Sequence, residues 1–393
     1  MSLTIPAASA ILLGLCMVLA FWLSRALTGW SIVAARRWGV VSRVSDRSSH
    51  AEPTPRLGGI GLFLGFVIPS SIFVALVFRF LRGPTGWGMN PPLMGWILLG
   101  AILMFAVGLA DDFFDLNPIV KFAGQIVALG PPALAGLRFL SVERFVLPVV
   151  SPTMLSMAAA LVWMLFFVNA FNFMDGMDGF ATRFSLTAIF WLFVAAAAGS
   201  VVGFASSAGD SPPGVPPIDL RVECFLLAIL SAACGGFYRL NRPPARVFMG
   251  DAGSLSLGYL LAAQAILADA GVYNSHPQPP EPGRAVTAPA VFIILFPFTF
   301  DVLLTLARRV RRGENLLRAH RSHLYQRLMI AGMTHAETLR VNQRYFVACG
   351  AAGCGYALAP TVELRALAAA FALAVMLRYW RFVVRKERAA ARE

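Results

Sequence analysis

The stretch MLSMAAALVWMLFFVNAFNFMDGMDGFA, at residues 154–181, decides the fold class of this 393-residue chain. Its first 18 residues carry no charge, and a helix of about 20 apolar residues crosses the roughly 30 Å hydrocarbon layer of a bilayer. Acidic residues appear only after that apolar run. The stretch therefore predicts a transmembrane helix that leads directly into a polar segment at one membrane surface.

Apolar runs of similar length recur along the whole chain. Hydrophobic residues make up 58% of the sequence and charged residues only 13%, whereas about a quarter is usual in soluble proteins. The pattern predicts an all-α, polytopic membrane helix bundle of about eleven (ten or eleven) transmembrane helices, in one integral-membrane domain that covers residues 1–393. The predicted spans are 3–23, 58–78, 93–110, 122–137, 154–171, 184–204, 222–238, 252–272, 286–306, 345–359 and 364–383.

The basic residues are distributed unevenly between the connections. The formal net charge is +13, and the positive-inside rule assigns Lys- and Arg-rich short loops to the cytoplasm. With the N-terminus outside, the inner loops receive nine arginines between residues 308 and 344 and also the basic tail. No basic stretch of the sequence is interleaved with aromatic residues as a strand-binding groove would need, which argues against nucleic acid as a partner. The expected partner of the apolar surface is the lipid bilayer.

Five unusual polar segments fall on the inner face in this topology. The spans are predicted from hydropathy alone, whatever the chemistry of these segments. The common position of the segments on the inner face is therefore independent support for a single site. The segments are residues 50–59, 111–125, 169–181, 246–254 and 318–332.

Asp111 and Asp112 lie at the end of the third span. Adjacent carboxylates at a helix C-terminus repel each other and oppose the helix dipole, which indicates a role with a metal, another cation or a proton. A solvated helix end is the alternative. Lys121 follows after a tight turn and is expected near these carboxylates or on a phosphate.

Two further acidic segments fit phosphate or metal chemistry. Asp175 and Asp178 are three residues apart and would share a face if the segment is helical, with Asn172 close before them. A glycine-rich interfacial turn is the alternative. Asp251 opens the eighth span in FMGDAGS, where a carboxylate is either an ordinary N-cap or a ligand for Mg²⁺ at a phosphate-binding helix N-terminus.

Asp301 and His323 are the remaining candidates. Asp301 lies well inside a predicted span, where a carboxylate faces either a cavity or a partner such as Arg308. His323 belongs to an arginine-rich loop together with Arg321, and it could be a metal ligand or an acid–base group. Because HxxH spacing alone is a weak zinc signal, phosphate binding fits the charge of this loop better.

Together, PTPRLGG, DDxxxLxxxxKxxxQ, NxxNFMDGxDG, VFMGDxGS and the RSH loop resemble the polyprenyl-phosphate N-acetylhexosamine-1-phosphate transferase family. Its members include the phospho-MurNAc-pentapeptide translocase and the GlcNAc-1-phosphate transferases that initiate surface glycans. The resemblance places the family core at about residues 45–345, before C-terminal helices at 345–383 and a basic tail at 384–393.

The resemblance implies transfer of a sugar-1-phosphate from a UDP-N-acetylamino sugar to undecaprenyl phosphate, with release of UMP. It implies a requirement for Mg²⁺, for which Mn²⁺ could substitute. It also implies a bacterial cytoplasmic (inner) membrane enzyme with a cytoplasmic active site, and a homodimer is common among members. Direct attack by the lipid phosphate is favoured, and a covalent aspartyl intermediate stays open.

The resemblance also suggests a role for each candidate residue. Asp111 and Asp112 match the catalytic acidic pair, and Asp251 matches the metal-binding position, with Asn172 nearby. His323 matches the first histidine of the family's inner-loop motif. The catalytic candidates are thus Asp111, Asp112, Asp251 and His323, and the metal candidates are Asp251 and Asn172. The substrate-binding candidates are Arg56, Lys121, Asn172, Asp175, Asp178, Phe248 and Arg321.

The sequence departs from the family pattern at one place and matches one branch of the family at another. Tyr325 and Gln326 stand where related members carry further histidines. Arg56 in PTPRLGG matches the sugar-1-phosphate branch, which favours lipopolysaccharide O-antigen or other surface-glycan initiation over peptidoglycan synthesis. A phospho-MurNAc-pentapeptide transferase is the alternative, and the donor sugar stays open.

Two other classes of protein explain part of the sequence. DDFFD matches the DDxxD motif of prenyl-transferring enzymes, but the glycine-broken MDGMDG does not supply their second aspartate-rich motif. A secondary transporter would account for many helices, but it would show internal repeats and polar residues near the midplane. The acidic residues here cluster at helix ends and in loops instead.

Overall fold

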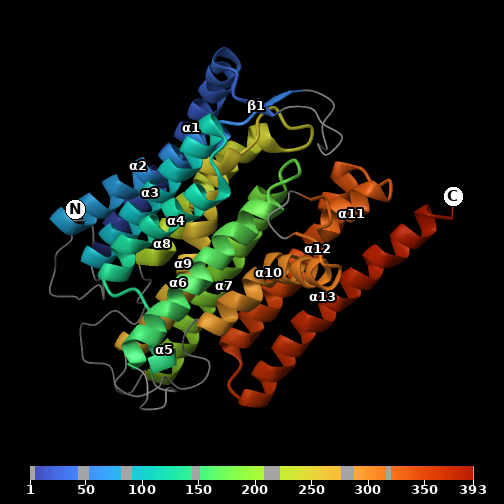
Figure 1. Cartoon of the computed structure of the whole chain (residues 1–393). Coiled ribbons are helices and arrows are strands. Elements are labelled where there is room, and N and C mark those ends of the chain that lie inside the picture. The colour runs from blue at the N-terminus through green and yellow to red at the C-terminus, as the bar shows by residue number, and fades with distance from the viewer. Residues whose placement is uncertain are drawn as a thin grey trace.

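The computed structural model describes residues 5–42, 53–80, 91–143, 151–207, 222–275, 287–315 and 320–392 (Figure 1). Each of the eleven predicted spans falls on one long helix within these ranges. These helices are α1 (Ile5–Trp38), α2 (Gly58–Phe80), α3 (Pro91–Phe114), α4 (Pro118–Leu134), α6 (Pro152–Met174), α7 (Phe180–Ser207), α8 (Val222–Asn241), α9 (Gly250–Ser275), α10 (Ala288–Arg311), α12 (His335–Leu358) and α13 (Val362–Ala390). Two short helices, α5 (Leu140–Glu143) and α11 (Leu324–Ile330), lie between them. Some residues of the predicted segments lie outside the described residues, namely 3–4 of the first span, 286 of the ninth span, 50–52 and 318–319 of the polar segments, and 393 of the basic tail.

The prediction of an all-α, polytopic membrane protein is confirmed. Among the described residues, seven helices are long and apolar enough to cross a membrane, namely α1, α2, α3, α6, α9, α10 and α13. Shorter apolar helices cover 180–196 in α7 and 225–241 in α8. The fourth and tenth predicted spans are helices too, but α4 has only 17 residues. α12 begins in a polar turn, in which Thr334 and Glu337 cap each other.

The first span was predicted too short. Helix α1 does not end near residue 23 but continues to Trp38, and Arg36 and Arg37 lie in its last turn. Residues 24–38 contain no proline that would break the helix. Hydropathy locates only the apolar part of a helix, so the polar continuation was not visible in it.

Helix α9 lies at the centre of the bundle and contacts α2, α3, α6 and α10. In its membrane-spanning window 83% of the residues are buried, compared with 17% in α1 and 22% in α13. Large apolar side chains on the outer helices, such as Leu15 and Leu367, are exposed. In a bilayer these side chains face lipid, because lipid tails are as apolar as they are.

Two close contacts bring the polar segments together. At Gly108 of α3, an added Cβ would overlap the carbonyl oxygen of Asp251, so only glycine allows α3 to approach α9 this closely. Strand β1 (Val41–Ser42) pairs antiparallel with β2 (Thr54–Pro55). The Phe248 amide then donates to the Pro55 carbonyl at 2.8 Å. PTPRLGG and VFMGD therefore lie side by side.

Candidate active site

Asp112 caps the N-terminus of α9 from the neighbouring helix α3. Its two carboxylate oxygens accept the backbone amides of Asp251 and Ala252, each at 2.9 Å. Gly250, with φ +66°, turns the chain so that a Cβ would overlap this carboxylate. A carboxylate on free helix N–H groups is favoured by both hydrogen bonding and the helix dipole. Asp112 is 4% exposed, so it holds α9 in place and presents little surface to a substrate.

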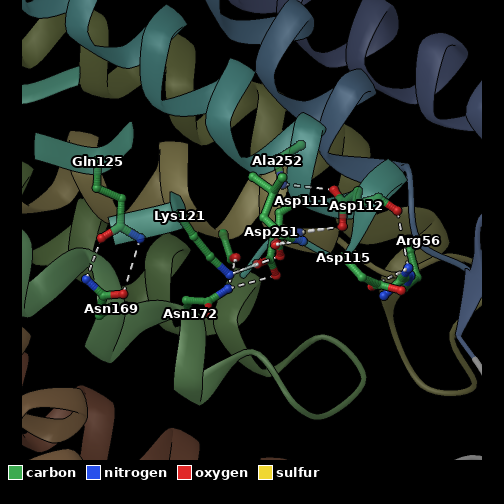
Figure 2. A network of polar contacts seen from close by, with 12 residues as sticks. Arg56, Asp111, Asp112, Asp115, Lys121, Gln125, Asn169, Asn172, Asp251 and Ala252 are labelled. Atoms are coloured by element: carbon green, nitrogen blue, oxygen red, sulfur yellow. Dashed lines mark hydrogen bonds and ion pairs between the residues drawn. The ribbon is translucent and has the colours of Figure 1, made fainter. Parts of the chain in front are cut away.

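Asp111 faces the other way, toward Lys121 of α4 (Figure 2). The Lys121 ammonium donates to Asp111 Oδ2 at 3.1 Å and also to Asp251 Oδ2. One positive group therefore joins two carboxylates that come from α3 and α9. The sequence-based expectation that Lys121 lies near these carboxylates is confirmed.

Asn172 completes this centre from the end of α6. Its Nδ2 donates to Asp251 Oδ1 at 2.9 Å and to Ser254 Oγ at 2.8 Å. One turn earlier, Asn169 and Gln125 exchange two hydrogen bonds, at 2.7 and 3.2 Å, which tie α6 to α4. Asp251 therefore does not cap its own helix; both of its oxygens face side chains from other helices.

Arg56 lies on the opposite side of Asp112 (Figure 2). Its guanidinium donates to the Asp112 carbonyl at 3.2 Å and lies 3.5 Å from Asp115 Oδ1. Asp115 has φ +46°, which places it in the left-handed region directly after α3. Its side chain is 82% exposed, so this ion pair is a surface one and contributes little to stability.

Asp175 and Asp178 do not share a helix face, because α6 ends at Met174 and the chain then turns. Burial, together with the negative charges of Asp251 and Asp112, raises the pKa of the Asp175 carboxyl well above its usual range. Asp178 accepts the Ala245 amide at 2.9 Å and faces His335 Nδ1 at 3.5 Å. Asp175 therefore belongs to the acidic centre, and Asp178 fixes the connection before α9.

Asp301 and His323 form a second, buried pair. His323 Nδ1 lies 3.0 Å from Asp301 Oδ1, and the two side chains are 3% and 1% exposed. Asp301 also accepts the Leu324 amide, at 2.9 Å to Oδ2, at the start of α11. The partner of Asp301 is thus His323 and not Arg308, the partner considered from the sequence. The pair leaves His323 Nε2 without a hydrogen-bond partner in the described structure.

Tyr325 stands where related family members carry a histidine, and in this protein it is a packing residue. It is fully buried, and its ring stacks on Phe180 at 4.6 Å between centroids. Its hydroxyl reaches the carbonyl of Phe173 at 3.5 Å. Helix α11 is therefore packed onto the end of α6 and the start of α7. Arg321 lies half-buried in this loop, and Phe248 lies half-buried before α9.

Residues 94–269 match the family model described as glycosyl transferase family 4. The chain is also 31% identical over 318 residues to the decaprenyl-phosphate N-acetylglucosaminephosphotransferase of Mycolicibacterium smegmatis, covering 78% of this chain and 73% of the relative. The chain belongs to glycosyl transferase family 4. This family 4 protein is therefore a transferase with several membrane-spanning helices.

Two other relatives mark the breadth of family 4. A probable undecaprenyl-phosphate N-acetylglucosaminyl 1-phosphate transferase of Bacillus subtilis is 27% identical over 310 residues, 77% of this chain and 73% of the relative. The phospho-N-acetylmuramoyl-pentapeptide-transferase of Corynebacterium jeikeium is 30% identical over 272 residues. That match covers 59% of this chain and 70% of the relative.

Several of the residues predicted from the sequence lie together in this family 4 protein, but the sequence did not indicate some residues that contact them. Ser254, which accepts a hydrogen bond from Asn172, carries no sequence signal for this contact. Gln125 is the last residue of the polar segment DDFFDLNPIVKFAGQ. Because Gln125 and Asn169 are far apart in the sequence, their side-chain hydrogen bonds could not be predicted from it. Asp301 was noticeable as an acidic residue inside an apolar span. Its partner His323 lies outside that span, directly before α11.

Proposed function

We propose that this protein transfers a sugar-1-phosphate from a UDP-N-acetylamino sugar to a polyprenyl phosphate and releases UMP. A phosphate oxygen of the lipid attacks the phosphorus that carries the sugar, and the bond from that phosphorus to the UMP oxygen breaks. N-acetylglucosamine is the first candidate sugar, because the M. smegmatis and B. subtilis relatives are named for it.

The observation that carries the proposal is the Asp111–Lys121–Asp251 arrangement at the ends of α3 and α9. Acceptor, donor and transition state are all anionic, so transfer requires positive charge in a fixed position. The site holds a cation, the Lys121 ammonium, between two carboxylates. Arg56 adds a second positive group nearby.

The donor atoms at this centre fit Mg²⁺. They are carboxylate and amide oxygens, which Mg²⁺ prefers, and a Mg²⁺ ion on a diphosphate needs only one or two protein carboxylates. Asp251 and the Asn172 amide oxygen would hold the ion, which would neutralise the diphosphate charge. Mn²⁺ prefers similar ligands.

The two neighbouring aspartates take different roles in this proposal. Both oxygens of Asp112 accept backbone amides, so Asp112 positions α9. Asp111 has an oxygen directed at Lys121 and is the group that accepts a proton from the lipid phosphate. His323, whose Nε2 has no hydrogen-bond partner in the described chain, and Arg321 bind a phosphate of the substrate. Asp175 and Phe248 line the nucleotide end, as the resemblance implies.

The same reasoning gives a location and a pathway. The positive-inside rule places this face in the cytoplasm of a bacterium, and the product would start a surface glycan such as a lipopolysaccharide O-antigen. A homodimer is part of the proposal and would appear as twice the protomer mass in light scattering. The second candidate is phospho-MurNAc-pentapeptide transfer, which the C. jeikeium relative favours.

A donor panel tests the proposal directly. Purified protein in detergent is given undecaprenyl phosphate, Mg²⁺ and one of UDP-GlcNAc, UDP-GalNAc, UDP-QuiNAc or UDP-MurNAc-pentapeptide, and UMP and lipid-linked product are measured. We expect product from a UDP-N-acetylamino sugar and its loss when Mg²⁺ is chelated. Turnover only with UDP-MurNAc-pentapeptide would replace the proposal by the second candidate.

The Asp251→Ala variant should lose turnover by roughly a thousandfold or more, because it removes charge stabilisation worth several kcal/mol. It should elute as folded protein with little change in thermal midpoint. Asp115→Asn is the matched control, since it removes an exposed carboxylate at a position where Asn tolerates the backbone. Near-normal turnover in Asp251→Ala would remove the proposed metal site.

A further inference from the structure

A groove of about 660 Å³ runs between α12 and α13, away from the acidic centre on α3, α4, α6 and α9. Its lining includes four arginines together with apolar and aromatic side chains. The lining residues that matter here are Arg344, Tyr345, Arg378, Arg381, Phe382 and Arg385.

The charge of the groove has one sign. All of its charged lining residues are arginines, and all four of these are exposed. Tyr345 and Arg378 both line the groove, so a phenol hydroxyl lies among the guanidinium groups. Planar guanidinium groups bind phosphate oxygens in pairs. The groove is therefore suited to a phosphate-bearing ligand.

The apolar surface continues from the groove along the same face of α13. Phe371 lies one turn before the lining residue Ala374, and Leu367 lies one turn earlier still. Their exposures are 54% and 64%. A cationic groove that continues into an exposed apolar strip matches a molecule with an anionic head and a hydrocarbon tail.

The opposite face of α13 is already used. Tyr379 and Val383 pack against Leu324 and Leu328 of α11, and Arg327 of α11 forms an ion pair with Glu387. Residues 379 and 383 point away from 381 and 385, because two residues turn a helix by about 200°. The arginine face therefore looks outward from α13, which lies at the edge of the bundle in Figure 1.

We propose that this groove binds the headgroup of an anionic phospholipid, with an acyl chain along Phe371 and Leu367. Basic pockets between transmembrane helices bind such headgroups where the leaflet is anionic. The site lies beside the loop that carries His323 but is formed by other helices, and it does not depend on the proposed reaction.

The experiment compares two charge-matched double variants, one within α13 and one at its C-terminal end. R381Q/R385Q removes two groove arginines, and R388Q/R392Q removes two arginines with the same spacing beyond the groove. Full-length protein is released from nanodiscs that contain phosphatidylglycerol or only neutral phosphatidylcholine, and bound lipid is counted by native mass spectrometry. We expect R381Q/R385Q to weaken phosphatidylglycerol binding roughly tenfold or more, and R388Q/R392Q to change it less than about twofold.

Three results would overturn the inference. One is equal loss of phosphatidylglycerol in both double variants, which would indicate unspecific surface charge. Another is displacement of the bound lipid by millimolar inorganic phosphate, which would indicate a free-phosphate site. The last is retention of undecaprenyl phosphate alone, which would indicate a substrate subsite. Unchanged thermal midpoints in neutral nanodiscs show that both variants are folded.

Discussion

Two helix N-termini in this protein are capped by an aspartate from a neighbouring helix, and they differ in what else that aspartate does. Asp112 of α3 caps α9, and both of its oxygens accept backbone amides. Asp301 of α10 caps α11 through the Leu324 amide and also contacts His323. The Asp112 carboxylate accepts backbone amides of the helix that it caps, while Asp301 also contacts a side chain.

Because of this difference, we expect the N-termini of α9 and α11 to respond differently to substitution. At α9 the proposed function assigns support and reactivity to separate residues, Asp112 and Asp111, so each can be altered alone. At α11 the Asp301 carboxylate both caps the helix and orients His323, so no substitution of Asp301 separates these two roles. Helix α11 has only seven residues and few hydrogen bonds of its own, which explains why it needs this anchor.

The largest expected effect separates Asp111 from Asp112. Asp111→Asn should lower turnover roughly 10²- to 10⁴-fold, the range for loss of a positioned proton acceptor, with little change in stability. Asp112→Asn replaces a carboxylate by an amide whose NH₂ faces a backbone N–H. It should cost about 2 kcal/mol of stability. UMP release and thermal unfolding in detergent measure the two effects.

Equal losses of activity and of stability in both variants would contradict this division of roles. Asp112→Glu provides a further check, because it keeps the charge but lengthens the side chain. It should lower the thermal midpoint while leaving part of the turnover.

A smaller effect is expected at the second cap. His323→Gln should lower kcat without changing amide hydrogen exchange in α11. Asp301→Asn should lower kcat roughly 10- to 100-fold, the usual result of losing a residue that orients a histidine, and should also speed exchange in α11. If Asp301→Asn changed kcat with normal exchange, Asp301 would not be the anchor of α11.

The smallest expected effect is a pH dependence at Asp175. Its folded-state pKa is raised, so between about pH 4, where an unfolded Asp titrates, and that raised pKa the folded state binds more protons. Stability therefore falls as pH rises through this window. Asp175→Asn should raise the thermal midpoint by a few degrees at pH 8 and less at pH 5, in Mg²⁺-free buffer. An equal shift at both pH values would show that the Asp175 carboxyl is not destabilised by ionisation.

The sequence predicted the helices because a membrane requires apolar runs whatever their partners are. It also gathered the acidic centre, since Asp111, Asn172 and Asp251 each follow or open an apolar run on the same side. The sequence could not show that Asp111 and Asp112 contact different partners. Successive side chains on a helix point about 100° apart, and only packing decides which one meets α9.

The His323 region was less predictable for a related reason. Asp301 and His323 are separated by 22 residues and by a change of element, so sequence distance favoured Arg308 as a partner. Tyr325 carried no signal of its burial against Phe180, because residue type alone does not show which face of a seven-residue helix is covered.

The position of α9 has a consequence for how the protein is made. This helix has the lowest mean hydropathy of the candidate spans, 1.2, and the largest buried share, 83%. It leaves the ribosome after α2, α3 and α6, so three of the helices that it contacts precede it, and α10 follows. It can therefore insert against protein instead of lipid, which demands less apolar surface. Asp112 cannot cap α9 until α9 has been synthesised. The contacts between the charged residues of α3 and α9 therefore form only after α9 has joined the bundle.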